Sequence, residues 1–140
     1  MTPGYSGTPL PKKLGITKPA MRVHVQGLPV GDYRALLGTA LPDGVVVKRA
    51  KGSGETDLMH LFTTERAELA ARLAELRSAL REDVPLWVSW PKKAAKVPTT
   101  ITEDVIREVA LPLGFVDIKV CAVSEVWSGL KLMVRREFRS

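Results

Sequence analysis

Lysine and tryptophan side chains gather where predicted strands begin and end, and these residues are the ones best suited to chemistry. Lysine ammonium groups bind phosphates as point charges, and indole faces stack on flat ligands such as bases. Ligand sites on parallel sheets lie beyond the carboxyl ends of the strands. We therefore expect one rim that binds an anionic ligand. Its candidate residues, together called the lysine–tryptophan rim, are Lys92, Lys93, Lys96, Trp90, Trp127, Lys131 and Thr64.

The net charge of +6 is concentrated in three segments. Residues 1–22 and 84–102 carry four and three basic residues without an acidic one, and 131–140 carry four against Glu137. Such segregation favours an anionic ligand, a nucleic acid or an acidic protein surface as the partner. In the alternative interpretation the lysines are a solvated surface and the tryptophans cap the core.

The elements that must position these residues follow from the spacing of apolar side chains. Leu69, Leu73, Leu76 and Leu80 recur at helical spacing, which predicts a helix with one leucine face on a sheet. Residues 127–129 are predicted to form a tight turn before the last strand. Helices are predicted at 32–41, 65–81 and 102–111, and strands at 21–25, from 45, and at 58–62, 86–90, 115–123 and 130–135.

Strands that alternate with helices predict a single α/β domain over residues 21–140. Its sheet is expected to be Rossmann-like and mostly parallel, with five or six strands and about three helices. The C-terminal strand pair is antiparallel, because its connection is too short for a crossover. Residues 51–57 contain no crossover helix, so this link runs back extended across the sheet or one flanking strand is reversed. Residues 1–20, with four prolines, are predicted to be an irregular basic arm.

Length and composition narrow the class of protein. The 140 residues suit one domain, and no apolar stretch reaches the ~20 residues of a membrane-spanning helix. The N-terminus lacks the basic start and apolar centre of a signal peptide, and the single Cys121 cannot form an internal disulfide. We expect a cytoplasmic protein that does not enter a membrane.

The sequence predicts neither a catalytic residue nor a metal site. It contains no P-loop, G-x-S-x-G, C-x-x-C or H-E-x-x-H pattern. His24 and His60 lie in predicted strands, where local hydrogen bonds are expected to satisfy them, since a metal site needs three or four convergent ligands.

Short motifs are spread over nearly the whole chain. They are GYSGTPL at 4–10, KLGI at 13–16, HLF at 60–62, WVSWPKK at 87–93 and WSGLK at 127–131. This set resembles the bacterial domain-of-unknown-function family 3052. That family has no established activity, so the resemblance implies relatives and not a reaction.

The order of elements from 57 to 136 carries a second resemblance. A strand, a leucine-rich helix, a strand, a helix and a terminal antiparallel pair are predicted there. This order is similar to the second half of class I methyltransferases, which bind S-adenosylmethionine on a Rossmann-like sheet. The resemblance implies a degenerate relative of that fold, and a fold by itself does not transfer function.

The turn after the first predicted strand is poorly suited to a nucleotide cofactor. Residues 26–31 read QGLPVG, without the G-x-G spacing that lets backbone approach such a ligand, and Pro29 removes a donor. The second strand ends in Lys48, Arg49 and Lys51, where an acidic residue would be needed to hold ribose hydroxyls. We therefore predict no binding of S-adenosylmethionine or a dinucleotide at this turn, and no other cofactor.

Three functions from different classes are compatible with these observations. The first is a non-catalytic binding module for a phosphate-bearing or other anionic ligand, which includes nucleic acid, at the lysine–tryptophan rim. The second is a methyltransferase-like enzyme with a degenerate S-adenosylmethionine site. The third is a protein-interaction subunit that docks through residues 1–20.

Overall fold

A twisted sheet is the element on which the others are arranged. A computed structural model describes residues 7–140 and contains six strands in the order β2-β1-β3-β4-β6-β5. The strands are β1 Arg22–Gln26, β2 Val46–Arg49, β3 Leu58–Phe62, β4 Leu86–Pro91, β5 Phe115–Ala122 and β6 Trp127–Val134. The first four are parallel, and β6 is antiparallel to both β4 and β5. The predicted Rossmann-like α/β fold is confirmed.

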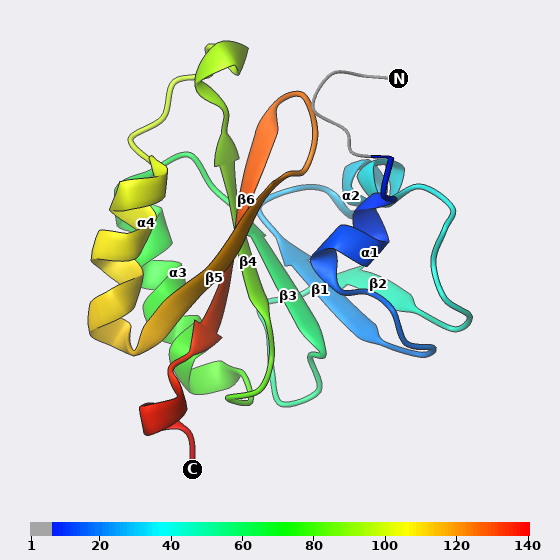
Figure 1. Ribbon diagram of the computed structural model, residues 1–140, viewed down its shortest axis with the longest axis horizontal. Coiled ribbons are helices and arrows are strands. Elements are labelled where there is room, and N and C mark those ends of the chain that lie inside the picture. The colour runs from blue at the N-terminus through cyan, green and yellow to red at the C-terminus, as the bar shows by residue number, and fades with distance from the viewer. Residues whose placement is uncertain (1–6) are drawn as a thin grey trace.

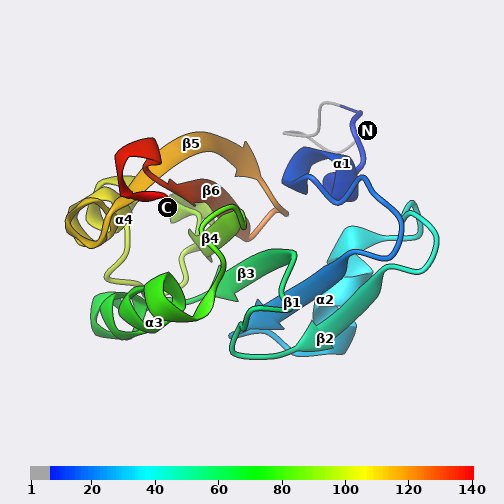
Figure 2. The same ribbon diagram turned by 90° about the horizontal axis from the view of Figure 1, so that it is seen from below.

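Helices cover both faces of this sheet. They are α1 Leu10–Leu14, α2 Val30–Leu37, α3 Arg66–Ala79 and α4 Glu103–Ala110, with short 3-10 turns η1 Lys93–Ala95, η2 Leu111–Leu113 and η3 Arg136–Phe138. In Figure 1, α3 and α4 lie to the left of the sheet, and α1 and α2 lie to the right. The view from below shows α1 and α3 on opposite sides of β3 and β4 (Figure 2). Each face of the sheet therefore has its own apolar core.

Residues 10–16 are part of the core, which corrects the prediction of an irregular arm. Leu10, Leu14 and Ile16 are buried, and the Trp87 indole N–H donates a 2.9 Å hydrogen bond to the Leu14 carbonyl. The prolines of this segment do not oppose α1, because they lie at its cap and in its first turn, where no backbone N–H is needed. Residues 1–6 of the predicted arm lie outside the described residues.

The predicted helices are present, and one of them is displaced. α3 and α4 lie within the predicted ranges 65–81 and 102–111. The helix predicted at 32–41 begins earlier and ends at Leu37, because Gly38 adopts a φ of +74° that stops the helix.

The tight turn predicted at 127–129 is the first part of β6. Gly129 lies inside β6, where it pairs with Ser89 of β4, and a Cβ on it would lie 2.9 Å from Val123 Cγ2 and 3.3 Å from the Trp87 ring. The chain turns earlier, where the Ser124 hydroxyl accepts hydrogen bonds from the N–H groups of Val126 and Trp127. This glycine therefore provides room for packing.

The link between β2 and β3 runs back across the sheet, as the first of the two alternatives predicted. Both strands are parallel to β1 and flank it on opposite sides. The link crosses the face that α3 covers, since a Cβ on Gly52 would lie 2.8 Å from Leu76 Cδ2. Its end is held by the Asp57 N–H, which donates to the Arg22 carbonyl. No helix is needed for this crossover.

A fully buried histidine lies at the centre of the sheet. His60 in β3 is 0% exposed, with its Nδ1 2.9 Å from the Tyr33 hydroxyl and its Nε2 2.7 Å from the Ser89 hydroxyl. Its ring also stacks on Phe62 with the ring centroids 4.3 Å apart. Burial lowers the pKa of His60 to about 3, because a charged imidazole would have no water around it. The folded protein therefore holds this histidine neutral.

Acidification should destabilise the fold through His60. In the unfolded chain its imidazole takes up a proton near its ordinary pKa of about 6.5, whereas the folded protein resists protonation down to about pH 3. Stability is therefore complete above pH 6.5 and falls below it. The loss between pH 7 and pH 5 should be about 2 kcal/mol in the free energy of unfolding, measured by urea titration.

The variant His60→Gln should show a smaller loss between these two pH values, although it is less stable at pH 7. The pKa of His24 is also lowered by burial, so His24→Gln is the matched comparison. An equal loss in wild type and in His60→Gln would contradict this assignment.

Candidate functional site

The carboxyl ends of β1 to β4 meet at one edge of the sheet, which is uppermost in Figure 1. The strands that follow β1 in the chain lie on both of its sides, with β2 on one and β3 on the other. A reversal of this kind is the position at which open α/β sheets bind their ligands. The loops after β1, β2 and β3 are therefore the first place to search for a site.

The backbone itself fills the space between the ends of β1 and β3. Gly27 follows β1 with a φ of +89°, and a Cβ on it would lie 1.9 Å from the Phe62 carbonyl oxygen at the end of β3. Only glycine allows so close an approach. Here the glycine brings two protein segments together, so no crevice is open to a ligand at that point.

The end of β1 and the end of β2 are lined by cationic and amide side chains. Two adjoining hollows of about 240 and 250 Å³ share Gln26 and Arg49, and we call them together the Arg49 hollow. Lys51 also lines it, and no carboxylate does. Within residues 7–140, Arg49 and Lys51 form no ion pair or side-chain hydrogen bond. This hollow is arranged to attract an anion.

Sequence reasoning noted the basic end of β2 but left it out of the candidate site, and it missed Gln26. The available signal was Arg49 at the end of β2, where a cofactor site would need an acidic residue. A basic residue at this position favours a negatively charged ligand. What the sequence could not show was that Gln26 and Arg49 line the same hollow.

The structure does not bring the seven residues of the lysine–tryptophan rim together. Trp90 faces the core under α3 and α4, whereas Trp127 lies on the other face, with its ring centroid 5.0 Å from that of Phe62. Lys131 lies four residues after Trp127 in β6, where it is paired with Trp87 of β4. The reason is the alternation of side chains along a strand, which sends neighbours to opposite faces.

Two separate hollows take the place of the single rim. One of about 410 Å³ is lined by Trp90 and Lys93 on the α4 side of the sheet. The other, of about 300 Å³, is lined by Trp127 and Asp32 on the α2 side. Lys92 and Lys96 line neither of them. Ligand binding by the residues of the lysine–tryptophan rim stays a prediction.

Lys131 belongs to a lysine pair on the sheet face. It is opposite Lys119 of β5, whose Nζ lies 5.9 Å from the centroid of the Trp87 ring. Burial, and then the neighbouring Lys119 charge, lower the pKa of Lys131. Its surroundings therefore differ from those of the lysines that follow β4.

Thr64, a candidate residue of the lysine–tryptophan rim, does not leave the N-terminus of α3 open, although the N-cap residue Glu65 makes no side-chain cap hydrogen bond. The first helical N–H, of Arg66, donates a 2.7 Å hydrogen bond to the Thr100 hydroxyl. The Thr64 carbonyl accepts from the Thr99 hydroxyl at 2.7 Å and from the Thr100 N–H. The segment after η1 thus covers the N-terminus of α3, which is not available to a phosphate.

The His60 cluster has distances like those of a nucleophile and its base, but it has no access to substrate. The Ser89 hydroxyl is 2.7 Å from His60 Nε2, yet both residues are 0% exposed. The low pKa of His60 also opposes a role as a base at neutral pH. The cluster is structural. In the described part of the chain, no group of three or more His, Cys, Asp or Glu side chains is placed to hold a metal ion.

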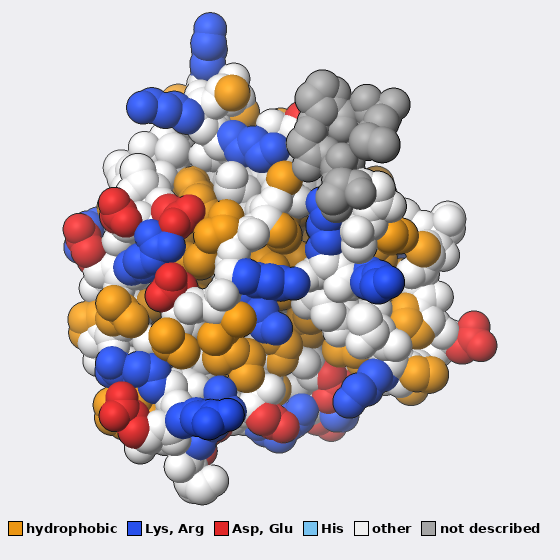
Figure 3. Space-filling model, viewed as in Figure 1, with side chains coloured by type: hydrophobic (Ala, Val, Ile, Leu, Met, Phe, Trp, Pro, Cys, Tyr) orange, Lys and Arg blue, Asp and Glu red, His pale blue; other side chains and the backbone are white. Residues whose placement is uncertain are grey.

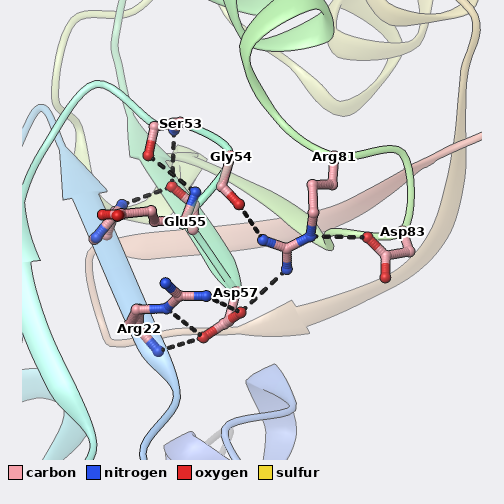
Figure 4. A network of polar contacts seen from close by, with 9 residues as sticks. Arg22, Ser53, Gly54, Glu55, Asp57, Arg81 and Asp83 are labelled. Atoms are coloured by element: carbon pink, nitrogen blue, oxygen red, sulfur yellow. Dashed lines mark hydrogen bonds and ion pairs between the residues drawn. The ribbon is translucent and has the colours of Figure 1, made fainter.

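Acidic side chains are paired at the opposite, amino edge of the sheet. Asp57 accepts hydrogen bonds from Arg22 at 3.1 Å and from Arg81 at 3.1 Å, and Arg81 also reaches Asp83 (Figure 4). The bond from Arg22 is the largest of the effects that lower the pKa of Asp57 to about 2. A hollow of about 410 Å³ beside this cluster is lined by Asp57, Arg81 and Asp83 together with Lys18. Most of the charge at the amino edge is therefore paired.

Replacing Asp57 by Asn should lower the free energy of unfolding at neutral pH by about 1–2 kcal/mol, because two arginines lose their partner. The stabilisation by this carboxylate is present above about pH 4 and is lost as the pH falls towards 2. The variant should therefore lose less stability than the wild type over that interval, as urea titrations would measure. Asp83→Asn is the matched control, and its exposed carboxylate should contribute under ~0.5 kcal/mol. Equal losses in the two variants would exclude a special role for Asp57.

Comparisons with known proteins relate the chain to others through its fold. No family model matches the sequence, and no curated protein matches it either. A S-adenosylmethionine-dependent methyltransferase from Aquifex aeolicus is similar in structure, with a TM-score of 0.67 and 16% identity over 89% of this chain and 87% of that one. A ribosomal protein L11 methylase from Lactobacillus delbrueckii subsp. bulgaricus gives 0.55 and 15% over 89% and 74%. A type 11 methyltransferase from Sulfolobus solfataricus gives 0.58 and 13% over 94% and 92%.

The residues of the Arg49 hollow do not fit the cofactor named for the Aquifex aeolicus protein. S-adenosylmethionine has a positive sulfonium and ammonium against one carboxylate and is therefore net positive, whereas the Arg49 hollow is cationic and has no carboxylate for ribose hydroxyls. The backbone contact of Gly27 closes the neighbouring crevice. The chain thus has the fold of class I methyltransferases, with a cationic hollow that no carboxylate lines at its ligand edge.

No helix over residues 7–140 is long and apolar enough to cross a membrane.

Proposed function

We propose that this protein is a non-catalytic binding module for a phosphate-bearing ligand, held in the Arg49 hollow. One observation carries the proposal. The hollow lies beyond the carboxyl ends of β1 and β2, where such sheets bind ligands, and its charged lining residues are cations without ion pairs. A phosphate would supply the negative charge that the protein does not.

The side chains of the hollow suit a phosphate in their hydrogen-bonding chemistry as well as in their charge. The planar Arg49 guanidinium donates paired hydrogen bonds to two oxygens of one phosphate, and the Gln26 amide adds a neutral donor. Lys51 contributes a point charge from the same side. Together they supply donors and no competing acceptor apart from the Gln26 carbonyl.

Three lysines of the lysine–tryptophan rim increase the positive potential of the same edge. Lys92, Lys93 and Lys96 form no ion pair with any residue of 7–140. Basic side chains gather over η1 at the top of the molecule (Figure 3). They act on a phosphate in the Arg49 hollow only through long-range attraction, because they lie outside that hollow.

The methyltransferase-like enzyme is the second candidate, favoured by the structural similarity to S-adenosylmethionine-dependent methyltransferases. The chemistry of the Arg49 hollow makes it the weaker one. Docking through residues 1–20 is weaker still, because Leu10, Leu14 and Ile16 are committed to the core. Removing this segment should unfold the protein rather than only abolish binding.

The test is the thermal stability of the protein with adenosine triphosphate, pyrophosphate and S-adenosylmethionine. Either phosphate compound at 100 times its dissociation constant should stabilise the wild type by about 2.7 kcal/mol. The double variant Arg49→Gln/Lys51→Gln should bind both at least about tenfold more weakly and with a flatter salt dependence. Its own stability should change by under ~0.5 kcal/mol, because both side chains are exposed.

The matched control is Lys12→Gln/Lys18→Gln, which removes the same charge from exposed positions that do not line the Arg49 hollow. It should bind phosphate compounds nearly as well as the wild type. Lys92→Gln/Lys93→Gln should weaken binding about two- to threefold, through long-range attraction alone. Unchanged binding in the Arg49 variant would overturn the proposal. Micromolar binding of S-adenosylmethionine would favour the enzyme instead.

A further inference from the structure

The hollow at the end of β4, which we call the Trp90 pocket, differs in character from the Arg49 hollow. Its volume of about 410 Å³ is within the range of small-molecule sites. The lining is mostly apolar, with a few polar groups among Trp90, Pro91, Lys93, Thr99, Ile101 and Glu103. Apolar walls with a small number of polar groups are typical of sites for compact organic ligands.

Trp90 contributes a hydrogen-bond donor without a partner. The side chain is 8% exposed, and no residue of 7–140 accepts a hydrogen bond from its indole N–H. The other deeply buried tryptophan, Trp87, has its indole N–H bonded to the Leu14 carbonyl at 2.9 Å. Unlike that of Trp87, the indole N–H of Trp90 reaches solvent. Since Trp90 lines this pocket, a ligand acceptor there would take the place of water as its partner.

The charges around the pocket favour an anionic acceptor. The Glu103 carboxylate is neutralised by Arg107, which donates a hydrogen bond to it. Lys93 is exposed and forms no ion pair within the described chain, so its ammonium is the one uncompensated charge of the lining. The Thr99 hydroxyl is already committed, since it donates to the Thr64 carbonyl.

From these observations we propose that the Trp90 pocket binds a small aromatic carboxylate. Its ring contacts Pro91 and Ile101, and its carboxylate oxygens accept hydrogen bonds from the Trp90 indole N–H and the Lys93 ammonium. The site is separate from the Arg49 hollow, because the two line different strand ends and share no residue. Ligand binding in the Trp90 pocket therefore does not depend on the proposed phosphate site.

Nitrogen–proton NMR spectra with benzoate as the probe test this assignment. The chain has three tryptophans, so three indole N–H signals are expected and Trp→Phe variants assign them. Benzoate at millimolar concentrations should shift the Trp90 signal in a saturable manner and leave the Trp87 signal in place. Lys93→Gln should weaken benzoate about three- to tenfold. Lys96→Gln is the matched control and should have no effect, because Lys96 does not line the pocket.

Benzyl alcohol, which has the same ring without the charge, should bind the wild type more weakly than benzoate does. Its affinity for Lys93→Gln should equal its affinity for the wild type, because it does not use the Lys93 charge. The exposed Lys93 can be replaced without disturbing the fold, so this arm is informative even if the Trp90→Phe variant is unstable. The absence of a saturable shift at Trp90 would overturn the proposal. So would a shift confined to Trp127, equal weakening by the two lysine variants, or equal affinity for the alcohol.

Discussion

The two hydrogen bonds of His60 are the constraint on which the centre of the structure depends. All five residues of β3 are buried, so a polar ring at its middle must be satisfied by protein groups. Tyr33 supplies one partner from α2 and Ser89 supplies the other from β4, which ties the helix and the neighbouring strand to the same ring. A shift of either element would leave a buried nitrogen without a partner, at a cost of about 1–3 kcal/mol.

The same face explains why the N-terminal segment is part of the domain. Trp87 lies beside His60 and also presents an indole N–H that needs an acceptor in the core. The Leu14 carbonyl supplies it, and α1 covers the tryptophan. Gly129 completes this arrangement, because any larger residue there would press on the Trp87 ring. Polar satisfaction and close packing thus act together on one side of the sheet.

Charge is divided between the two edges of the sheet, and this division links fold to function. At the amino edge Asp57 holds Arg22 and Arg81, so positive and negative groups cancel near the start of the strands. At the carboxyl edge Arg49 and the lysines of the η1 region have no such partners among residues 7–140. The fold is similar to that of a S-adenosylmethionine-dependent methyltransferase, and in this chain the hollow at the ligand edge is lined by cations without a carboxylate. A similar fold does not determine the site, because different residues are responsible for each.

The sequence by itself determined the architecture of this protein, and only the tertiary structure decided its candidate sites. The leucine spacing of α3 and the strand–helix alternation predicted a mostly parallel Rossmann-like sheet, because periodicity and connection length are local properties. The path of residues 10–16 was not predictable, since the acceptor that Trp87 needs lies 73 positions away in the chain. The lysine–tryptophan rim divided because Trp90 and Trp127 face opposite sides of the sheet, which strand pairing decides. Gln26 and Arg49 meet only because β1 and β2 pair side by side, and such contacts between distant segments exist only in the folded chain.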